Sequence, residues 1–489
     1  MSRLNGEVTS VIQDNKEIEL RVYGDEFYAR HESLDGYTAI YDQDAEKYCY
    51  AILQEGKLVT TGIGVDQPAP EGLQLHIKED STVRSQKFMK RFNELRPRQK
   101  KTEGREPLAF GPYRGLIDNN LLTEGEIHGL TVLVEFADLP LAVSNEDIDD
   151  MLNGENYHGN GNYSSVRKYF ETMSSGRLKY INHVVGPVKL PHNRSYYTQV
   201  LLVEDAMDIL MRDFNIDLSE YDSKRREIVD AVNFFYAGPS ISEGHLWPHN
   251  SEVDLQYGSY KIKGYMLTGA GRSSSDLAIG TFCHETGHLL CRFCDIYDYG
   301  ERDGDDKESE GIGEYCLMGS GNHLNNGHTP SPICAYQRKL VGWYDNEVNL
   351  NGRSGRITVK HGDYNTIYKY NTDKEQEYFL VENRANIELD KHLPSSGLAI
   401  YHCDILGSNE NQDGGATRHY QVALMQADGN LDLEKNRNRG DRTDLFGNID
   451  GVAFAFNTNP SSIQWDTKDS GFKISNITNP AEEIEFTIG

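Results

Sequence analysis

The sequence predicts an α+β fold in which a mixed sheet and a buried helix lie between two β-rich regions. Three observations support this prediction. Strand-like segments fill the first hundred residues and the chain after about residue 350, whereas apolar strands and amphipathic helices occupy the middle. The composition changes sharply near residue 84, where the chain becomes basic. The length of 489 residues suits about three domains, which we place at residues 1–105, 106–346 and 347–489.

The N-terminal region is predicted to be β-rich, because β-branched and aromatic residues mix with polar ones between turns that contain glycine. Strands are expected at residues 17–28, 36–41, 48–53 and 57–61. Residues 84–105 then carry nine basic side chains and two acidic ones. In so acidic a protein this stretch is expected to be a solvated linker or a short helix that ends a pro-segment-like unit.

The middle region is predicted to hold buried strands and amphipathic helices. Apolar runs indicate strands at residues 130–136 and 228–236. Helical spacing of apolar residues indicates helices at residues 166–173, after an N-cap at Ser165, and at residues 203–214. The C-terminal region returns to strands, expected at residues 355–360, 377–382, 397–402, 420–426 and 472–477.

Charge and composition exclude several classes of protein. A net charge of −27 argues against a nucleic-acid binder or a protein that binds anionic membranes. No stretch approaches 18 consecutive apolar residues, so no membrane span is expected. The N-terminal residues lack an apolar segment after a basic start, so no secretory signal is expected and the sequence alone favours the cytoplasm. Seven cysteines are too few, and odd in number, for a disulfide framework.

The segment HETGH at residues 284–288 is the main chemical signal. On a helix His284 and His288 are four residues apart, so both imidazoles project from one face and can hold one Zn²⁺. Glu285 lies beside them as a candidate general base. Asp276 is expected to cap this helix. The competing interpretation is a pair of core histidines that are satisfied by hydrogen bonds.

A catalytic zinc needs a third protein ligand and an open position. The candidates that follow His288 are Cys291, Cys294, Asp295 and Asp298.

Residues 284–298, together with CLMGSG at residues 316–321, resemble the immune inhibitor A-like metallopeptidases of bacteria. The resemblance implies a metzincin-like zinc protease domain, protein or peptide substrates, export from the cell, and a methionine turn in which Met318 supports the zinc. It extends over most of the chain through segments in matching order, at residues 24–40, 166–178, 247–249, 330–343, 378–384, 393–404 and 440–446.

The chain departs from this family's pattern after the helix. Cys291 replaces a glycine that would suit a left-handed helix stop, and the Asp-x-Tyr-Asp block arrives one residue late, which implies a longer turn. Alignment to that block makes Asp295 the third ligand, whereas plain counting points to Cys294, and Asp298 is a further alternative. Cys291 and Cys294 also form a C-x-x-C pair, for which a local disulfide or simple packing is expected.

Calcium is a second metal to consider. Relatives often carry a calcium-style loop where this chain has residues 221–230, but Lys224, Arg225 and Arg226 would oppose a divalent ion there. A second acidic cluster is expected to be a solvated loop, with calcium as the alternative; it comprises Asp303, Asp305, Asp306, Glu308 and Glu310. Possible cleft residues are Trp247, His249, His323 and His328.

The expected function is that of a zinc-dependent endopeptidase in which Glu285 takes a proton from the attacking water. The alternative is a catalytically silent relative that acts as a protein- or glycan-binding module, since the turn that carries the third ligand is altered. Location stays open between the cytoplasm and export, and no feature of the sequence indicates an oligomeric state.

Overall fold

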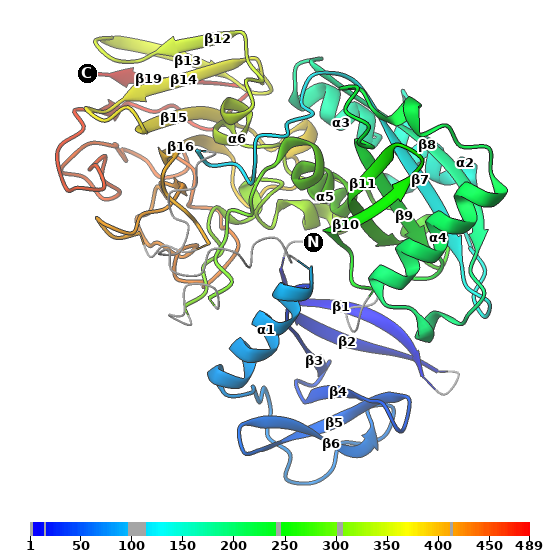
Figure 1. Cartoon of the computed structure of the whole chain (residues 1–489). Helices are drawn as coiled ribbons and strands as arrows, with labels where there is room; N and C mark the ends of the chain where they lie inside the picture. Colours follow the sequence, from blue (N-terminus) through cyan, green and yellow to red (C-terminus); the bar gives the residue numbers. More distant parts are fainter. Residues whose placement is uncertain (1–2, 14–15, 96–113, 241–245, 301–306, 411–413) are drawn as a thin grey trace.

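The computed structural model describes residues 3–13, 16–95, 114–240, 246–300, 307–410 and 414–489. Three regions meet around helix α5 (Ile279–Cys291): a blue N-terminal sheet, a cyan-to-green central sheet with its helices, and a yellow-to-red C-terminal region (Figure 1). Within the described ranges no helix is both long and apolar enough to cross a membrane.

The N-terminal region is a six-stranded antiparallel meander in which each strand pairs with the next one along the chain. Its strands are β1 (Leu4–Gln13), β2 (Lys16–Gly24), β3 (Ala29–Ser33), β4 (Thr38–Asp42), β5 (Lys47–Gln54) and β6 (Lys57–Gly64).

The strand expected at residues 17–28 is divided in the structure. At Gly24 φ is +120°, and a Cβ there would lie 2.0 Å from the Tyr28 carbonyl oxygen, so the chain turns at a position that glycine tolerates best.

The basic stretch begins as a helix. Helix α1 (Ser81–Leu95) buries Phe88, Phe92 and Leu95 and leaves most of its charged residues on the outside. This agrees with the short helix expected for the first half of the stretch. Residues 96–105 lie outside the described part of the chain.

The central sheet is mixed, as expected, with strand order β10-β11-β9-β7-β8. Four strands run parallel, and β10 is antiparallel to β11 at the edge. The strands are β7 (Gly125–Glu135), β8 (Leu178–Lys189), β9 (Ala231–Tyr236), β10 (His249–Tyr257) and β11 (Tyr260–Gly269).

Helices cover both faces of this sheet. One face packs against α2 (Asn145–Asn153), α3 (Val166–Met173) and α5, and the other packs against α4 (Gln199–Asp213). Alternation along β9 explains the two layers, because Phe235 faces the first group and Phe234 the second. Helix α3 has the predicted bounds, and the Ser165 side chain accepts from the Lys168 N–H as an N-cap.

The C-terminal region contains a five-stranded sheet, β12-β14-β15-β16-β17, and a three-stranded sheet, β13-β19-β18. Helix α6 (Ala335–Leu340) leads into it. The strands are β12 (Asn346–Asn349), β13 (Gly355–Lys360), β14 (Thr366–Asn371), β15 (Glu377–Arg384), β16 (Gly397–Asp404), β17 (Val422–Leu424), β18 (Ile474–Ser475) and β19 (Glu483–Ile488).

Two buried arginines, Arg384 and Arg338, connect the C-terminal region to the central one. The Arg384 guanidinium, 1% exposed, contacts the Asp390 carboxylate at 2.7 Å and also donates to the Tyr315 carbonyl at 2.8 Å. Arg338 on α6 contacts the Glu382 carboxylate on β15 at 2.6 Å. Because buried charges need partners, these contacts fix how the two regions dock.

Candidate metal centre

Helix α5 is buried along nearly its whole length, and Thr281 is the one residue of the helix that is not fully buried. The Phe282 ring stacks on the Phe235 ring of the central sheet at 5.5 Å. The expected cap at Asp276 is wrong: that carboxylate instead accepts from the Arg272 N–H at 2.7 Å. The Ile279 N–H donates to Asn162 Oδ1 at 3.1 Å, so a distant side chain caps the helix.

The two helix histidines are held in one orientation by backbone carbonyls. His284 Nδ1 lies 2.9 Å from the Leu317 carbonyl oxygen, and His288 Nδ1 lies 2.7 Å from the Phe293 carbonyl oxygen. A carbonyl accepts only, so each Nδ1 carries a proton and each Nε2 of a neutral ring presents a lone pair. The two Nε2 atoms lie 3.2 Å apart.

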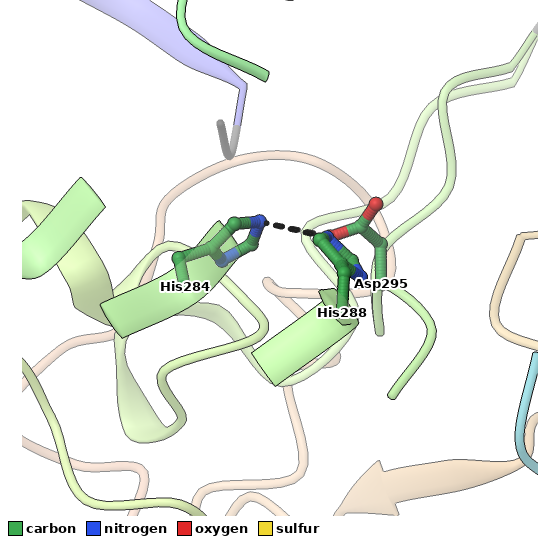
Figure 2. Close-up of side chains that lie close together, drawn as sticks. All are labelled: His284, His288 and Asp295. Atoms are coloured by element: carbon green, nitrogen blue, oxygen red, sulfur yellow. Dashed lines mark hydrogen bonds and ion pairs between the residues drawn. The ribbon is translucent and has the colours of Figure 1, made fainter. Parts of the chain in front are cut away.

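Asp295, on the loop after α5, completes the group. Its Oδ1 lies 3.2 Å from His284 Nε2 and 3.3 Å from His288 Nε2. Figure 2 shows the three side chains turned toward one another, with the histidines on the helix and Asp295 beside them. Asp295 Oδ2 accepts a hydrogen bond from the Tyr299 hydroxyl at 2.8 Å, which orients the carboxylate.

The carboxylate and the imidazoles of this group shift one another's pKa. Burial opposes ionisation of Asp295, but the neighbouring histidines outweigh it and hold the pKa of the carboxyl well below its usual range. Burial likewise disfavours a charged His288, yet Asp295 raises the pKa of that imidazole. Asp295 Oδ1 is buried and has no conventional hydrogen-bond donor within the described residues. Two imidazole nitrogens and one carboxylate form a ligand set that fits zinc.

Glu285 follows His284 on the same helix and is 1% exposed. Its backbone carbonyl accepts from the Asn250 side-chain amide at 3.4 Å, so β10 contacts the helix at this point. The Glu285 carboxylate is not part of the three-residue ligand group. It is adjacent in sequence to His284, one of the candidate ligands.

The alternative third ligands lie elsewhere. Cys294 Sγ is 3.1 Å from Gln421 Oε1, and burial raises the pKa of this thiol to about 12. Asp298 Oδ1 accepts from the Gly300 N–H at 2.7 Å. Cys291 and Cys294 are both free cysteines, and Cys291 is buried. The C-x-x-C pair therefore forms no disulfide.

The turn after helix α5 explains why the Asp-x-Tyr-Asp block comes one residue later than in the immune inhibitor A-like pattern. Helix α5 includes Cys291, and the left-handed residue is Arg292, with φ of 57° and its N–H bonded to the Gly287 carbonyl. Met318 packs beneath the helix, where its Sδ would lie 2.7 Å from a Cβ placed on Gly287. Its neighbour Leu317 supplies the carbonyl that orients His284.

Other expected site residues are not brought to this group. His249 Nε2 contacts the Tyr265 hydroxyl at 3.1 Å, and Trp247 is buried beside it. None of His249, His323 and His328 joins the ligand group among the described residues, and the cleft role of these histidines and of Trp247 stays a prediction. The sequence does not indicate that Tyr299 or the carbonyls of Leu317 and Phe293 contact the ligand group. The only signal for Tyr299 is the neighbouring Asp-x-Tyr-Asp block.

At the two positions considered for calcium, the described carboxylates have partners within the protein. In residues 221–230 the Asp222 carboxylate accepts from the Arg226 and Glu227 N–H groups, and Arg226 lies 3.6 Å from Asp230. Of the second acidic cluster, residues 303, 305 and 306 lie outside the described residues. Glu308 accepts from Asn436, and Glu310 accepts from Ser320.

No family model matches the chain, and no curated protein matches it. Among solved structures, metalloproteinase-II from Bacteroides fragilis is similar over 59% of this chain and 77% of that chain, with 11% sequence identity and a TM-score of 0.19. At that TM-score the similarity supports no conclusion about this protein. Membership of the immune inhibitor A-like family and a metzincin-like fold therefore stay predictions.

Proposed function

We propose that the chain is a zinc-dependent endopeptidase in which His284, His288 and Asp295 hold the metal. One observation carries the proposal: three buried acceptor atoms converge at 3.2–3.3 Å while both Nδ1 atoms are committed to backbone carbonyls. Lone pairs at that separation repel one another unless a cation lies among them. The immune inhibitor A-like resemblance of the surrounding segments supports the same assignment.

Zinc, when bound, supplies Lewis-acid chemistry that polarises a peptide carbonyl and makes water more acidic. Glu285 accepts the proton of the attacking water and then passes it to the amine of the departing product. The Leu317 and Phe293 carbonyls keep the imidazoles in the tautomer that coordinates through Nε2. Tyr299 keeps the Asp295 carboxylate oriented, and Met318 supports the helix from below.

The proposal extends to residues 1–105 as a pro-segment. Its support is an aromatic cluster in which Phe27 and Phe88 lie 5.6 and 5.7 Å from the Tyr299 ring. Phe92 and Tyr297 belong to the same buried cluster. The N-terminal region thus packs on the side chain that orients a candidate metal ligand.

Metal analysis combined with casein cleavage tests the metal site. The full chain should bind one zinc and cleave casein, and His284→Ala, His288→Ala and Asp295→Ala should each lose both properties. Glu285→Gln should keep the zinc and lose cleavage, because it removes the base without removing a ligand. The matched control is His392→Ala, an exposed histidine far along the chain from the ligand group.

The outcomes separate the candidate functions. Zinc that survives both histidine substitutions would contradict the site. A protein that binds one zinc but cleaves neither casein nor peptide libraries would favour the silent binding module.

Limited trypsin digestion tests the pro-segment. The basic residues between 96 and 105 offer trypsin sites, and cleavage there should raise casein hydrolysis. A control chain with these residues replaced by glutamine should stay intact and keep its basal activity. Unchanged activity after complete cleavage, with the N-terminal piece removed, would contradict this role.

A further inference from the structure

A second group of carboxylates lies in the C-terminal region, apart from the histidine site. Asp428, Asp441 and Asp444 each offer an oxygen, and these three atoms lie within 4.8 Å of one another. They come from the loops that follow β17. One Ca²⁺ with ligands at about 2.3–2.6 Å spans such a separation.

Hydrogen bonds occupy five of the six oxygens of these carboxylates, and among the described residues only Asp444 Oδ1 receives none. Thr443 Oγ1 lies 2.6 Å from Asp428 Oδ2 and 2.7 Å from Asp441 Oδ1, and its single proton can be donated to only one of these two oxygens at a time. Asp444 Oδ2 accepts from the Asp441 N–H at 2.6 Å and from the Tyr315 hydroxyl at 2.9 Å.

The other oxygen of Asp444 is the informative atom. Asp444 is 0% exposed, and its Oδ1 has no hydrogen-bond partner among the described residues. A buried carboxylate oxygen without a partner is strongly unfavourable unless a cation or water satisfies it. A divalent ion between the three carboxylates would satisfy it.

The charges of this group are also uncompensated. Within the described part of the chain no lysine or arginine forms an ion pair with Asp428, Asp441 or Asp444. At neutral pH these like charges therefore repel one another across a short distance.

We propose that Asp428, Asp441 and Asp444 form a calcium site. All three ligands are carboxylate oxygens, which suit a hard cation, and no histidine or cysteine belongs to the group as zinc would favour. The site is separate from both positions that the sequence indicated for calcium. It does not depend on the proposed peptidase activity.

The position of this site indicates that the ion would have a structural role. Tyr315 donates to Asp444 and lies three residues before Met318, whereas its carbonyl accepts from Arg384. At Gly440 a Cβ would lie 2.9 Å from the Tyr315 ring, so the acidic loop presses on that tyrosine. Calcium would therefore stabilise the segment that runs beneath helix α5.

Calcium titration of the full chain tests the proposal. After chelation and desalting, isothermal titration should show one calcium site with a dissociation constant of about micromolar to millimolar. Asp444→Asn should weaken that site more than about tenfold, and calcium should no longer raise its melting temperature. The matched control is Asp450→Asn, which removes the same charge from an exposed neighbour and should bind like the wild type.

Asp428→Asn provides a second variant, because Asp428 is only half-buried and its substitution disturbs the fold less. If Asp444→Asn does not fold, the affinity of Asp428→Asn decides the outcome. The proposal is overturned if the wild type binds no calcium at millimolar concentrations. It is equally overturned if the folded aspartate variants bind calcium as tightly as the wild type, or if magnesium binds and calcium does not.

Discussion

Removal of one hydroxyl at Tyr299 should weaken the metal site without disturbing its packing. The hydroxyl donates to Asp295 Oδ2 at 2.8 Å, whereas the ring packs in the aromatic cluster with Phe27 and Phe88. Burial, and then the charge of Asp295, raise the pKa of Tyr299 well above its usual range, so the phenol stays a donor throughout an ordinary assay. Tyr299→Phe keeps the ring and deletes only the donor.

The expected size of the effect follows from the bond that is lost. A hydrogen bond to a charged group contributes about 1.5–3 kcal/mol, and each 1.4 kcal/mol is a factor of about ten in an equilibrium constant. Groups that orient metal ligands contribute about 10–100-fold in metal affinity. Both estimates predict that Tyr299→Phe binds zinc about 10–100-fold more weakly than the wild type.

Competition with a fluorescent zinc chelator measures this difference on the full chain. Tyr297→Phe is the matched control, because its hydroxyl lies 3.1 Å from that of Tyr299 and no hydrogen bond joins it to Asp295 among those described. Its zinc affinity should change much less. Zinc affinity of Tyr299→Phe within about twofold of the wild type, in a protein whose Asp295→Ala variant loses zinc, would refute the reasoning.

Three further predictions concern stability, each measured by urea unfolding. Gly287→Val should destabilise the fold by about 1–3 kcal/mol, because even a Cβ there meets Met318 Sδ at 2.7 Å; an unchanged midpoint would contradict the packing. Arg384→Met should remove about 3–5 kcal/mol by stranding Asp390, and the double variant with Asp390→Asn should recover part of it. Burial raises the pKa of Glu314 from 4.5 to about 7, so the folded protein binds the proton more tightly and loses stability as pH rises through that window, by at most roughly 3 kcal/mol. Glu314→Gln should flatten this pH dependence; an unchanged slope would contradict the assignment.

Local patterns predicted much of the fold. Helix α3 begins and ends where the apolar spacing and Ser165 indicated, since both signals lie within a few adjacent residues. The edge strand β10 and its neighbour β11 are not indicated by the sequence, because their exposed and buried positions alternate irregularly around a bulge. The cap of α5 was also missed: Asn162 lies 117 residues before Ile279, and no local pattern indicates such a contact.

In the candidate site, too, local sequence patterns predict some features and not others. The spacing of His284 and His288 follows from helix geometry, and both lie where that geometry places them. Asp295 was named through the Asp-x-Tyr-Asp block, and the structure brings it to the histidines, although its role as a ligand stays a prediction. The carbonyls of Leu317 and Phe293 have no sequence signature, because any residue carries the same acceptor.

If the histidine site binds zinc as proposed, the aromatic contacts of Tyr299 make two equilibria depend on each other. One is the retention of the N-terminal sheet on the rest of the molecule, and the other is the affinity of the histidine site for its ion. Linkage is reciprocal. If docking of the N-terminal sheet strengthens metal binding by a given free energy, metal binding strengthens docking of the sheet by the same amount. Tryptic cleavage of the basic stretch should then release the N-terminal piece faster from metal-depleted protein, and equal release rates would show that Tyr299 carries no coupling.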